Sequence, residues 1–219
     1  MEDFEKEILE DARIYAEDLF SAEKSGHDFF HMIRVADTAL LIAGREGADP
    51  FLVELSALLH DVDDVKLFPE TAGECLHARS FMEKWNLGEE TIERVIHIIR
   101  QVSFKGTDSE VPDSIEGKCV QDADRLDAIG AIGIARAFTY GGNHGRAMYD
   151  PEVPPMLDMD EDTYRNRSSH TLNHFYEKLF LLKDMMNTET GRRIAEKRHS
   201  FMENFVDEFL EEWNGVSEI

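Results

Sequence analysis

The chain has 219 residues, of which 42% are hydrophobic, and a formal net charge of −23 at pH 7. That length and hydrophobic fraction suffice for one well-buried domain. The negative charge excludes a broad surface for duplex nucleic acid or for an anionic membrane, and it means that a site for a phosphorylated compound needs a local cation or metal ion.

Apolar residues recur at helical spacing through the first sixty residues. The first helix ends before Ser25-Gly26, and its buried face carries Phe4, Ile8, Ala12, Tyr15 and Leu19. A second helix runs from Phe29 to Arg45. Asp49-Pro50 then supplies an N-cap and a proline at the first helical position, so a third helix is expected from there to about His60.

The rest of the chain is also predicted to be helical. We expect further helices at about 69–85, 89–103, 119–138, 161–186 and 189–213. Because no period-2 run rich in β-branched residues appears, the predicted fold class is all-α. A polar loop is expected at 104–117, and residues 139–160 form either a lid or substrate-contact loop or an ordinary surface loop.

Cysteine usage and the N-terminal sequence bear on the compartment. Cys75 and Cys119 show neither a CxxC pair nor a disulfide framework, which is typical of a reducing environment. No stretch of about 18 apolar residues occurs, and the first residues are acidic where a signal peptide is basic. We therefore expect a soluble, cytoplasmic protein.

Three segments hold residue types that bind metal ions. His31 lies four residues after His27, His60-Asp61 closes an apolar run, and Asp124 lies in an Asp-rich stretch. Imidazoles and carboxylates together suit a divalent metal that keeps positions open for water and substrate. Since neighbouring side chains point about 100° apart on a helix, His60 and Asp61 can reach one ion only over a helix end or at a bend.

Each segment also has an ordinary structural explanation. His60-Asp61 can simply end a helix, and Asp124 can form a core ion pair with a nearby arginine. His97 stands among three isoleucines, which favours a histidine satisfied within the core. His170 and His174 have i, i+4 spacing but no accompanying carboxylate motif. The metal hypothesis therefore depends on the three segments acting together.

Taken together, these segments resemble the signature of the HD-superfamily metal-dependent phosphohydrolases. The signature is carried by His31-Met-Ile-Arg34, Leu58-Leu59-His60-Asp61 and Ala123-Asp124-Arg125-Leu126. Further segments are similar to a bacterial branch that includes nucleotide pyrophosphohydrolases: 26–31, 60–68, 103–106, 121–130, 140–142 and the tail 188–199. The resemblance implies a single-domain helical HD-domain fold over 1–219, with the metal core at about 20–130 and C-terminal helices at 161–213 packing on it.

The resemblance also implies roles for individual residues. One divalent cation (Mn²⁺, Ni²⁺, Mg²⁺ or another transition ion) would be bound by His31, His60, Asp61 and Asp124, and the two histidines favour a transition metal over Mg²⁺. The expected catalytic residues are Asp64, which positions or deprotonates water, Lys66, which counters phosphate charge, and His27, which polarises a phosphate or donates to the leaving group. The expected substrate contacts are Lys105, Arg136 and Arg146, with Asp127 and Asp28 orienting neighbouring side chains.

The implied reaction is hydrolysis of a phosphate ester or phosphoanhydride in a small substrate, with metal-activated water attacking phosphorus. The leading hypothesis is cleavage of a nucleoside triphosphate to monophosphate and pyrophosphate. A nucleotide phosphomonoesterase, a cyclic-nucleotide phosphodiesterase and a non-catalytic nucleotide-binding sensor stay open as alternatives. The expected partner is a small phosphorylated substrate, with no duplex nucleic acid and no membrane, and the aromatic tail at 201–213 is compatible with a homodimer.

Overall fold

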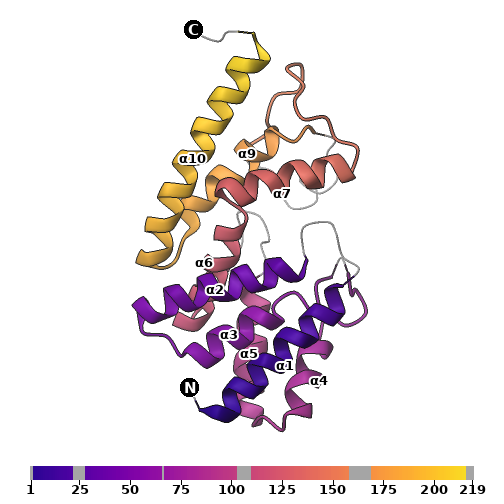
Figure 1. The fold of residues 1–219 in the computed structure, drawn as a ribbon, viewed down its shortest axis with the longest axis vertical. Helices are drawn as coiled ribbons and strands as arrows, with labels where there is room; N and C mark the ends of the chain where they lie inside the picture. The colour runs from indigo at the N-terminus through magenta and orange to yellow at the C-terminus, as the bar shows by residue number, and fades with distance from the viewer. Residues whose placement is uncertain (1, 22–27, 66, 103–109, 158–168, 216–219) are drawn as a thin grey trace. The chain divides into compact units, whose positions relative to one another are not determined.

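The computed structural model describes residues 2–21, 28–65, 67–102, 110–157 and 169–215, and these residues form helices and turns without any strand (Figure 1). The predicted all-α class is thereby confirmed. The chain divides into two compact units, Met1–Asp124 and Arg125–Ile219, and each is described by itself below. Among the helices so described, none is long and apolar enough to span a membrane.

The first unit is organised around a central helix, α3 (Pro50–Leu59), which packs against α1, α2 and α5 (Figure 1). Every residue of α3 from Phe51 to Leu59 is buried, as expected for a helix that is hydrophobic on all sides. Asp49 caps it by accepting the backbone N–H groups of Phe51 and Leu52. The other helices of this unit are α1 (Asp3–Phe20), α2 (Phe29–Glu46), α4 (Leu76–Lys84), α5 (Glu89–Val102) and, up to Asp124, α6 (Ile115–Asp127).

The second unit has a core of aromatic side chains. Its elements are α7 (Gly130–Asn143), α9 (Asn173–Glu177), the 3-10 helix η2 (Leu179–Met185) and α10 (Glu189–Trp213). The long α10 packs against α7 and η2. Its Phe205 and Phe209 meet Phe138 of α7 and Phe175 of α9, with ring centroids 6.0 to 6.2 Å apart. The helix predicted at 189–213 is confirmed.

The single helix predicted at 119–138 is wrong, because the backbone breaks between α6 and α7. Gly130 begins α7 with a φ of +79°, in the left-handed region where a side chain is disfavoured. The carbonyls exposed at the end of α6 are taken up by arginines: Arg198 donates to Leu126 O and Arg136 donates to Asp127 O. The apolar periodicity continues across Gly130, so it predicted one helix where the structure has two.

Two other predicted helices differ from the structure. The one expected at 69–85 begins only at Leu76, because Cys75 adopts a left-handed φ of 53° and the residues before it form turns. The one expected at 161–186 is not continuous over its described part, 169–186, which contains only α9 and η2. Lys178 separates those two elements with a φ of −144°, which no helix accommodates.

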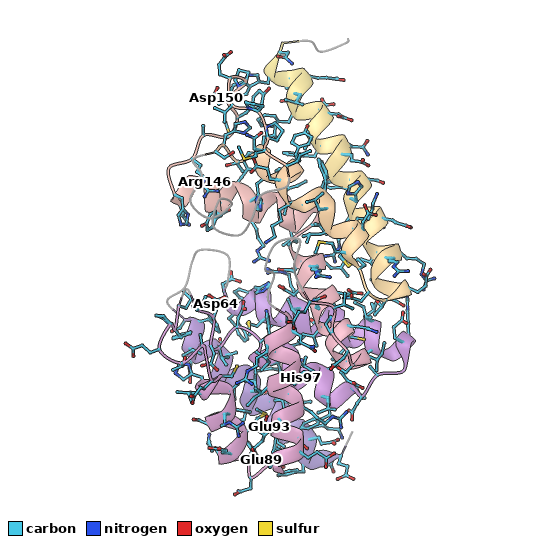
Figure 2. All side chains as sticks on the ribbon, turned by 180° about the vertical axis from the view of Figure 1, so that it is seen from behind. Asp64, Glu89, Glu93, His97, Arg146 and Asp150 are labelled. Carbon is cyan, nitrogen blue, oxygen red and sulfur yellow. The ribbon has the colours of Figure 1, made fainter. Side chains whose placement is uncertain are left out.

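His97 is not the core histidine that its apolar neighbours predicted (Figure 2). Its side chain is 55% exposed, and its Nε2 lies 2.9 Å from Asp113 Oδ2. The buried face of α5 includes Ile92, Val95, Ile96, Ile99 and Val102, and at 3.6 residues per turn position 97 falls outside that face. The hydrogen bond from His97 lowers the pKa of Asp113 below its usual value.

His170 has a structural role. Its Nε2 lies 3.0 Å from the carbonyl oxygen of Val153, which can only accept, and its Nδ1 accepts the backbone N–H of Asn173 at 3.2 Å. Both ring nitrogens are therefore used by the backbone. His174, the other member of the i, i+4 pair, has its pKa lowered to about 3 by burial and by nearby Lys178 and Arg146. Because both ring nitrogens of His170 are already bonded, the pair does not offer two imidazole ligands to one ion.

The backbone break at Gly130 predicts opposite effects for two alanine substitutions in α7. Gly130→Ala should lower the free energy of unfolding by about 1–2 kcal/mol, because a left-handed φ is strained and the new Cβ would lie 3.0 Å from Arg198 Cγ. Gly142→Ala, with nothing within 4 Å of its Cβ, should raise it by up to about 1 kcal/mol. Urea unfolding followed by circular dichroism measures both; equal effects would contradict the break.

Cys119 should be chemically inert in the folded protein. It is fully buried on α6, and burial, with the nearby Asp122, Glu46 and Glu116, raises its thiol pKa to about 12. Since the thiolate is the reactive form, Ellman's reagent at pH 8 should label it at least about tenfold more slowly in the native protein than in guanidinium. The Cys75→Ser background isolates its signal, and native labelling at the denatured rate would contradict this account.

Candidate metal centre

His31 is held at the beginning of α2 by the residue that caps the helix. The Asp28 carboxylate accepts the backbone N–H of His31 at 2.9 Å, so the cap fixes the first helical turn. His31 is 1% exposed. Asp28 is thus a helix cap that fixes the backbone of His31, and its predicted role toward neighbouring side chains stays a prediction.

His60 and Asp61 lie at a helix end, where two neighbouring side chains can reach the same ion. Helix α3 ends at Leu59, so both side chains emerge where the helix stops. The Nδ1 atom of His60 lies 2.7 Å from Ala57 O, and because a carbonyl can only accept, Nδ1 carries the proton. In the neutral ring this leaves the lone pair on Nε2, which is the tautomer that a metal ligand needs.

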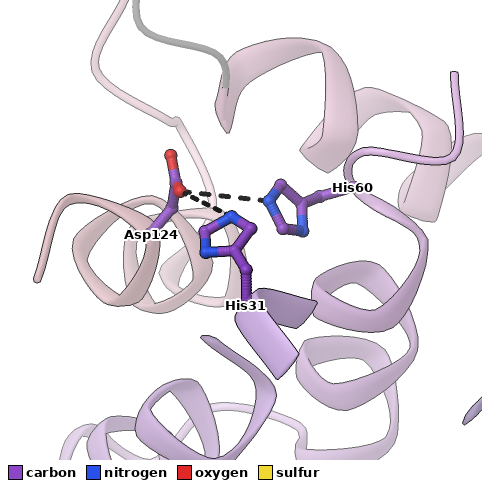
Figure 3. Close-up of side chains that lie close together, drawn as sticks. All are labelled: His31, His60 and Asp124. Carbon is purple, nitrogen blue, oxygen red and sulfur yellow. Dashed lines mark ion pairs between the residues drawn. The ribbon is translucent and has the colours of Figure 1, made fainter. Parts of the chain in front are cut away.

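Three side chains of the predicted ligand set, those of His31, His60 and Asp124, lie together (Figure 3). Asp124, from α6, places Oδ1 3.5 Å from His31 Nε2 and 3.9 Å from His60 Nε2. Asp61 places Oδ2 3.5 Å and 3.4 Å from the same two nitrogens. The carboxylate of Asp124 is 25% exposed whereas the two imidazoles are buried, so solvent reaches the cluster at Asp124.

The chemistry of this cluster fits a divalent cation. Within the described part of the chain, the buried Nε2 of His60 has no hydrogen-bond partner, a costly state for a polar atom unless something else binds it. His31, His60 and Asp124 each offer an atom within 4.8 Å of the others. Ligands about 2.0–2.2 Å from one ion lie roughly 3 to 3.5 Å apart, close to the spacings found here.

The turn that follows Asp61 carries two further acids. Asp64 is half-buried, and its backbone N–H donates to Asp61 O at 2.9 Å. Asp63, which the sequence did not single out, is 6% exposed and accepts two backbone N–H groups at the start of α4. The signal available in the sequence was the run of three acids in four residues, from Asp61 to Asp64, in which a buried member needs partners.

Gln121 is a second residue that the sequence did not single out. It is fully buried, and its side-chain amide donates to Gln101 O at 2.6 Å and to Glu110 O at 2.9 Å. These two carbonyls lie on either side of residues 103–109. The segment predicted to contribute Lys105 thus has both flanks tied to the helix that carries Asp124.

The predicted basic substrate contacts that the structure describes lie in the second unit. Arg136 Nη1 lies 2.6 Å from Asp127 Oδ2, and the orienting role of Asp127 stays a prediction. Arg146 places its guanidinium carbon 5.4 Å from the centre of the Tyr140 ring, on which His144 also stacks at 3.9 Å. Contact with substrate stays a prediction for both arginines. The predictions for His27, Lys66 and Lys105 fall outside the described residues.

Comparisons with known proteins place the chain in a family. The HD domain family model matches residues 28–129. YpgQ of Bacillus subtilis (strain 168) is 43% identical over 209 residues, 94% of each chain. A Lactobacillus plantarum structure is 39% identical with a TM-score of 0.84, and covers 95% of this chain and 97% of its own. An HD-superfamily hydrolase from Bacillus thuringiensis is 41% identical with a TM-score of 0.75, over 96% and 98%.

A crystal structure of YpgQ in complex with ADP is also similar, with 39% identity and a TM-score of 0.75. The match covers 95% of this chain and 100% of the YpgQ chain. The matched segment 28–129 contains every residue of the cluster, His31, His60, Asp61 and Asp124. HD domains bind divalent metals, which is the ligand that this donor set fits. The chain belongs to the HD superfamily of hydrolases.

Proposed function

We propose that this protein is a metal-dependent phosphohydrolase that cleaves a nucleoside triphosphate to the monophosphate and pyrophosphate. The observation that carries the proposal is that the carboxylates of Asp61 and Asp124 each lie 3.4 to 3.9 Å from the imidazole Nε2 atoms of His31 and His60. The complex of YpgQ with ADP supports a nucleotide as the class of ligand.

The donor set explains how a protein this acidic accepts a polyphosphate. A divalent ion bound at the cluster supplies positive charge against the phosphoryl oxygens and lowers the pKa of water to near neutrality. His31 and His60 contribute neutral nitrogen donors, so the site keeps more of the ion's charge than four carboxylates would. That residual charge offsets the repulsion expected from a chain with a net charge of −23.

Asp64 is the residue that we assign to the attacking water. It follows Asp61 by three residues in the same turn, and its backbone N–H is bonded to Asp61 O. A carboxylate at this position can accept a proton from water, which is general-base catalysis. Lys66 and Lys105 are assigned to counter phosphate charge, and His27 to the phosphate or the leaving group. We further propose that the catalytic unit acts in the cytoplasm as a single domain or as a homodimer.

The assignment of metal ligands predicts a loss of metal binding in matched variants. His60→Ala and Asp124→Ala should each weaken Mn²⁺ binding by at least about tenfold, because each removes one donor. The controls are His97→Ala and Asp113→Ala, which remove an exposed residue of the same type from the same unit. Calorimetric titration with Mn²⁺ and metal analysis of protein purified without chelator measure the effect. Metal binding equal in all five proteins would refute the site.

The proposed reaction predicts both products and the position of attack. Nucleoside tri-, di- and monophosphates and cyclic nucleotides should be incubated with Mn²⁺, Mg²⁺, Co²⁺ or Ni²⁺ in ¹⁸O-labelled water. We expect equimolar pyrophosphate and monophosphate, with the label found in one product only. Asp64→Asn should lower kcat by about 10²- to 10⁴-fold with metal affinity retained.

Other products would select the competing functions. Orthophosphate from monophosphates would indicate a phosphomonoesterase, and a linear monophosphate from a cyclic nucleotide would indicate a phosphodiesterase. Saturable nucleotide binding without turnover under every metal would indicate a sensor.

A further inference from the structure

The side chain of Asp63 points away from solvent and into the start of a neighbouring helix. It is 6% exposed, its Oδ1 accepts the N–H of His77 at 3.1 Å, and its Oδ2 accepts the N–H of Ala78 at 3.0 Å. Both donors lie in the first turn of α4, fourteen and fifteen residues further along the chain. Each carboxylate oxygen thus has a backbone partner.

Asp63 supplies a cap that α4 lacks locally. The first N–H groups of a helix have no partner within the helix, and a negative charge is favoured beside them. The residue at the N-cap position of α4 is Cys75, which has a left-handed φ of 53° and makes no side-chain cap. The carboxylate of Asp63 takes this place from a distant part of the sequence.

His77 makes a second connection between the same two segments. Its Nδ1 lies 2.9 Å from Val62 O and therefore donates to that carbonyl, and it lies 3.4 Å from Asp63 Oδ1. The imidazole also packs edge-on against Phe68, with ring centroids 5.1 Å apart. Two consecutive residues of the turn, Val62 and Asp63, are consequently hydrogen-bonded to α4.

Val62 and Asp63 lie between Asp61, the proposed metal ligand, and Asp64, the proposed general base. Asp61 precedes them and places its carboxylate 3.4 Å from His60 Nε2. Asp64 follows them; its N–H donates to Asp61 O, and its carbonyl accepts from Leu67 and Phe68 at 3.0 and 2.7 Å. A shift of the turn at Asp63 would therefore move both the ligand and the candidate base.

We propose that Asp63 is a positioning residue that orders the turn so that Asp61 faces the metal and Asp64 faces the attacking water. The proposal rests on the proposed function above. In this view Asp63 acts only through the backbone: its bonds to α4 set the register of the turn, and the stability of the cluster depends on them.

The experiment compares two aspartates, Asp63 and Asp49, that each accept two backbone N–H groups at the start of a helix. Asp63→Ala removes a carboxylate that accepts two helix N–H groups, and Asp49→Ala removes another, which accepts Phe51 and Leu52 at the start of α3. Both variants should melt at a lower temperature than wild type. Only Asp63→Ala should bind Mn²⁺ about 10- to 100-fold more weakly in a calorimetric titration, with Asp49→Ala within about twofold of wild type.

Asp63→Asn keeps the shape of the side chain and one accepting oxygen, so it decides the matter if Asp63→Ala does not fold. It should bind Mn²⁺ at least about threefold more weakly than wild type and, at saturating metal, show a lower kcat with an unchanged KM. Metal affinity and kcat equal to those of Asp49→Ala would make Asp63 a helix cap alone and overturn the inference. Wild-type protein that binds no Mn²⁺ would instead refute the proposed function, and this inference with it.

Discussion

The structure depends on holding two carboxylates, those of Asp61 and Asp124, 3.4 to 3.9 Å from the Nε2 atoms of His31 and His60 in a largely buried place. Polar atoms withdrawn from water carry a desolvation cost unless a partner satisfies them, and the Nε2 of His60 has no hydrogen-bond partner among the described residues. A divalent cation meets that need, since it accepts both nitrogen and oxygen donors.

Helix ends place three of those donors, while Asp124 lies within α6. His31 lies in the first turn of α2, which Asp28 caps, and His60 and Asp61 follow the last residue of α3. The turn that follows Asp61 is held to the first turn of α4 by hydrogen bonds of Asp63 and His77. Side chains at a helix end can converge in ways that the fixed 100° step within a helix forbids, and the capping bonds supply the rigidity that a bound ion requires.

The candidate metal-binding residues and most helices of the first unit were accessible from the sequence. The apolar periodicity gave α1, α2, α3 and α5 nearly to their ends, and Asp49-Pro50 marked the start of α3. Local sequence patterns failed to predict helix boundaries where contacts with a distant residue set the backbone conformation. Gly130 is left-handed next to Arg198, and the start of α4 is capped by a carboxylate fourteen residues earlier, which no local pattern encodes.

By itself the sequence determined the all-α class and the residue types that can bind a metal, because helical spacing and donor chemistry are local properties. Tertiary structure decided which donors meet, which ring nitrogen of His60 carries the proton, and that His97 faces solvent although isoleucines surround it in the sequence. It also separated the acids that follow His60: Asp63 turns inward to a helix, while Asp61 lies beside the histidines. The physical reason is that burial and hydrogen bonding depend on partners brought together only by folding.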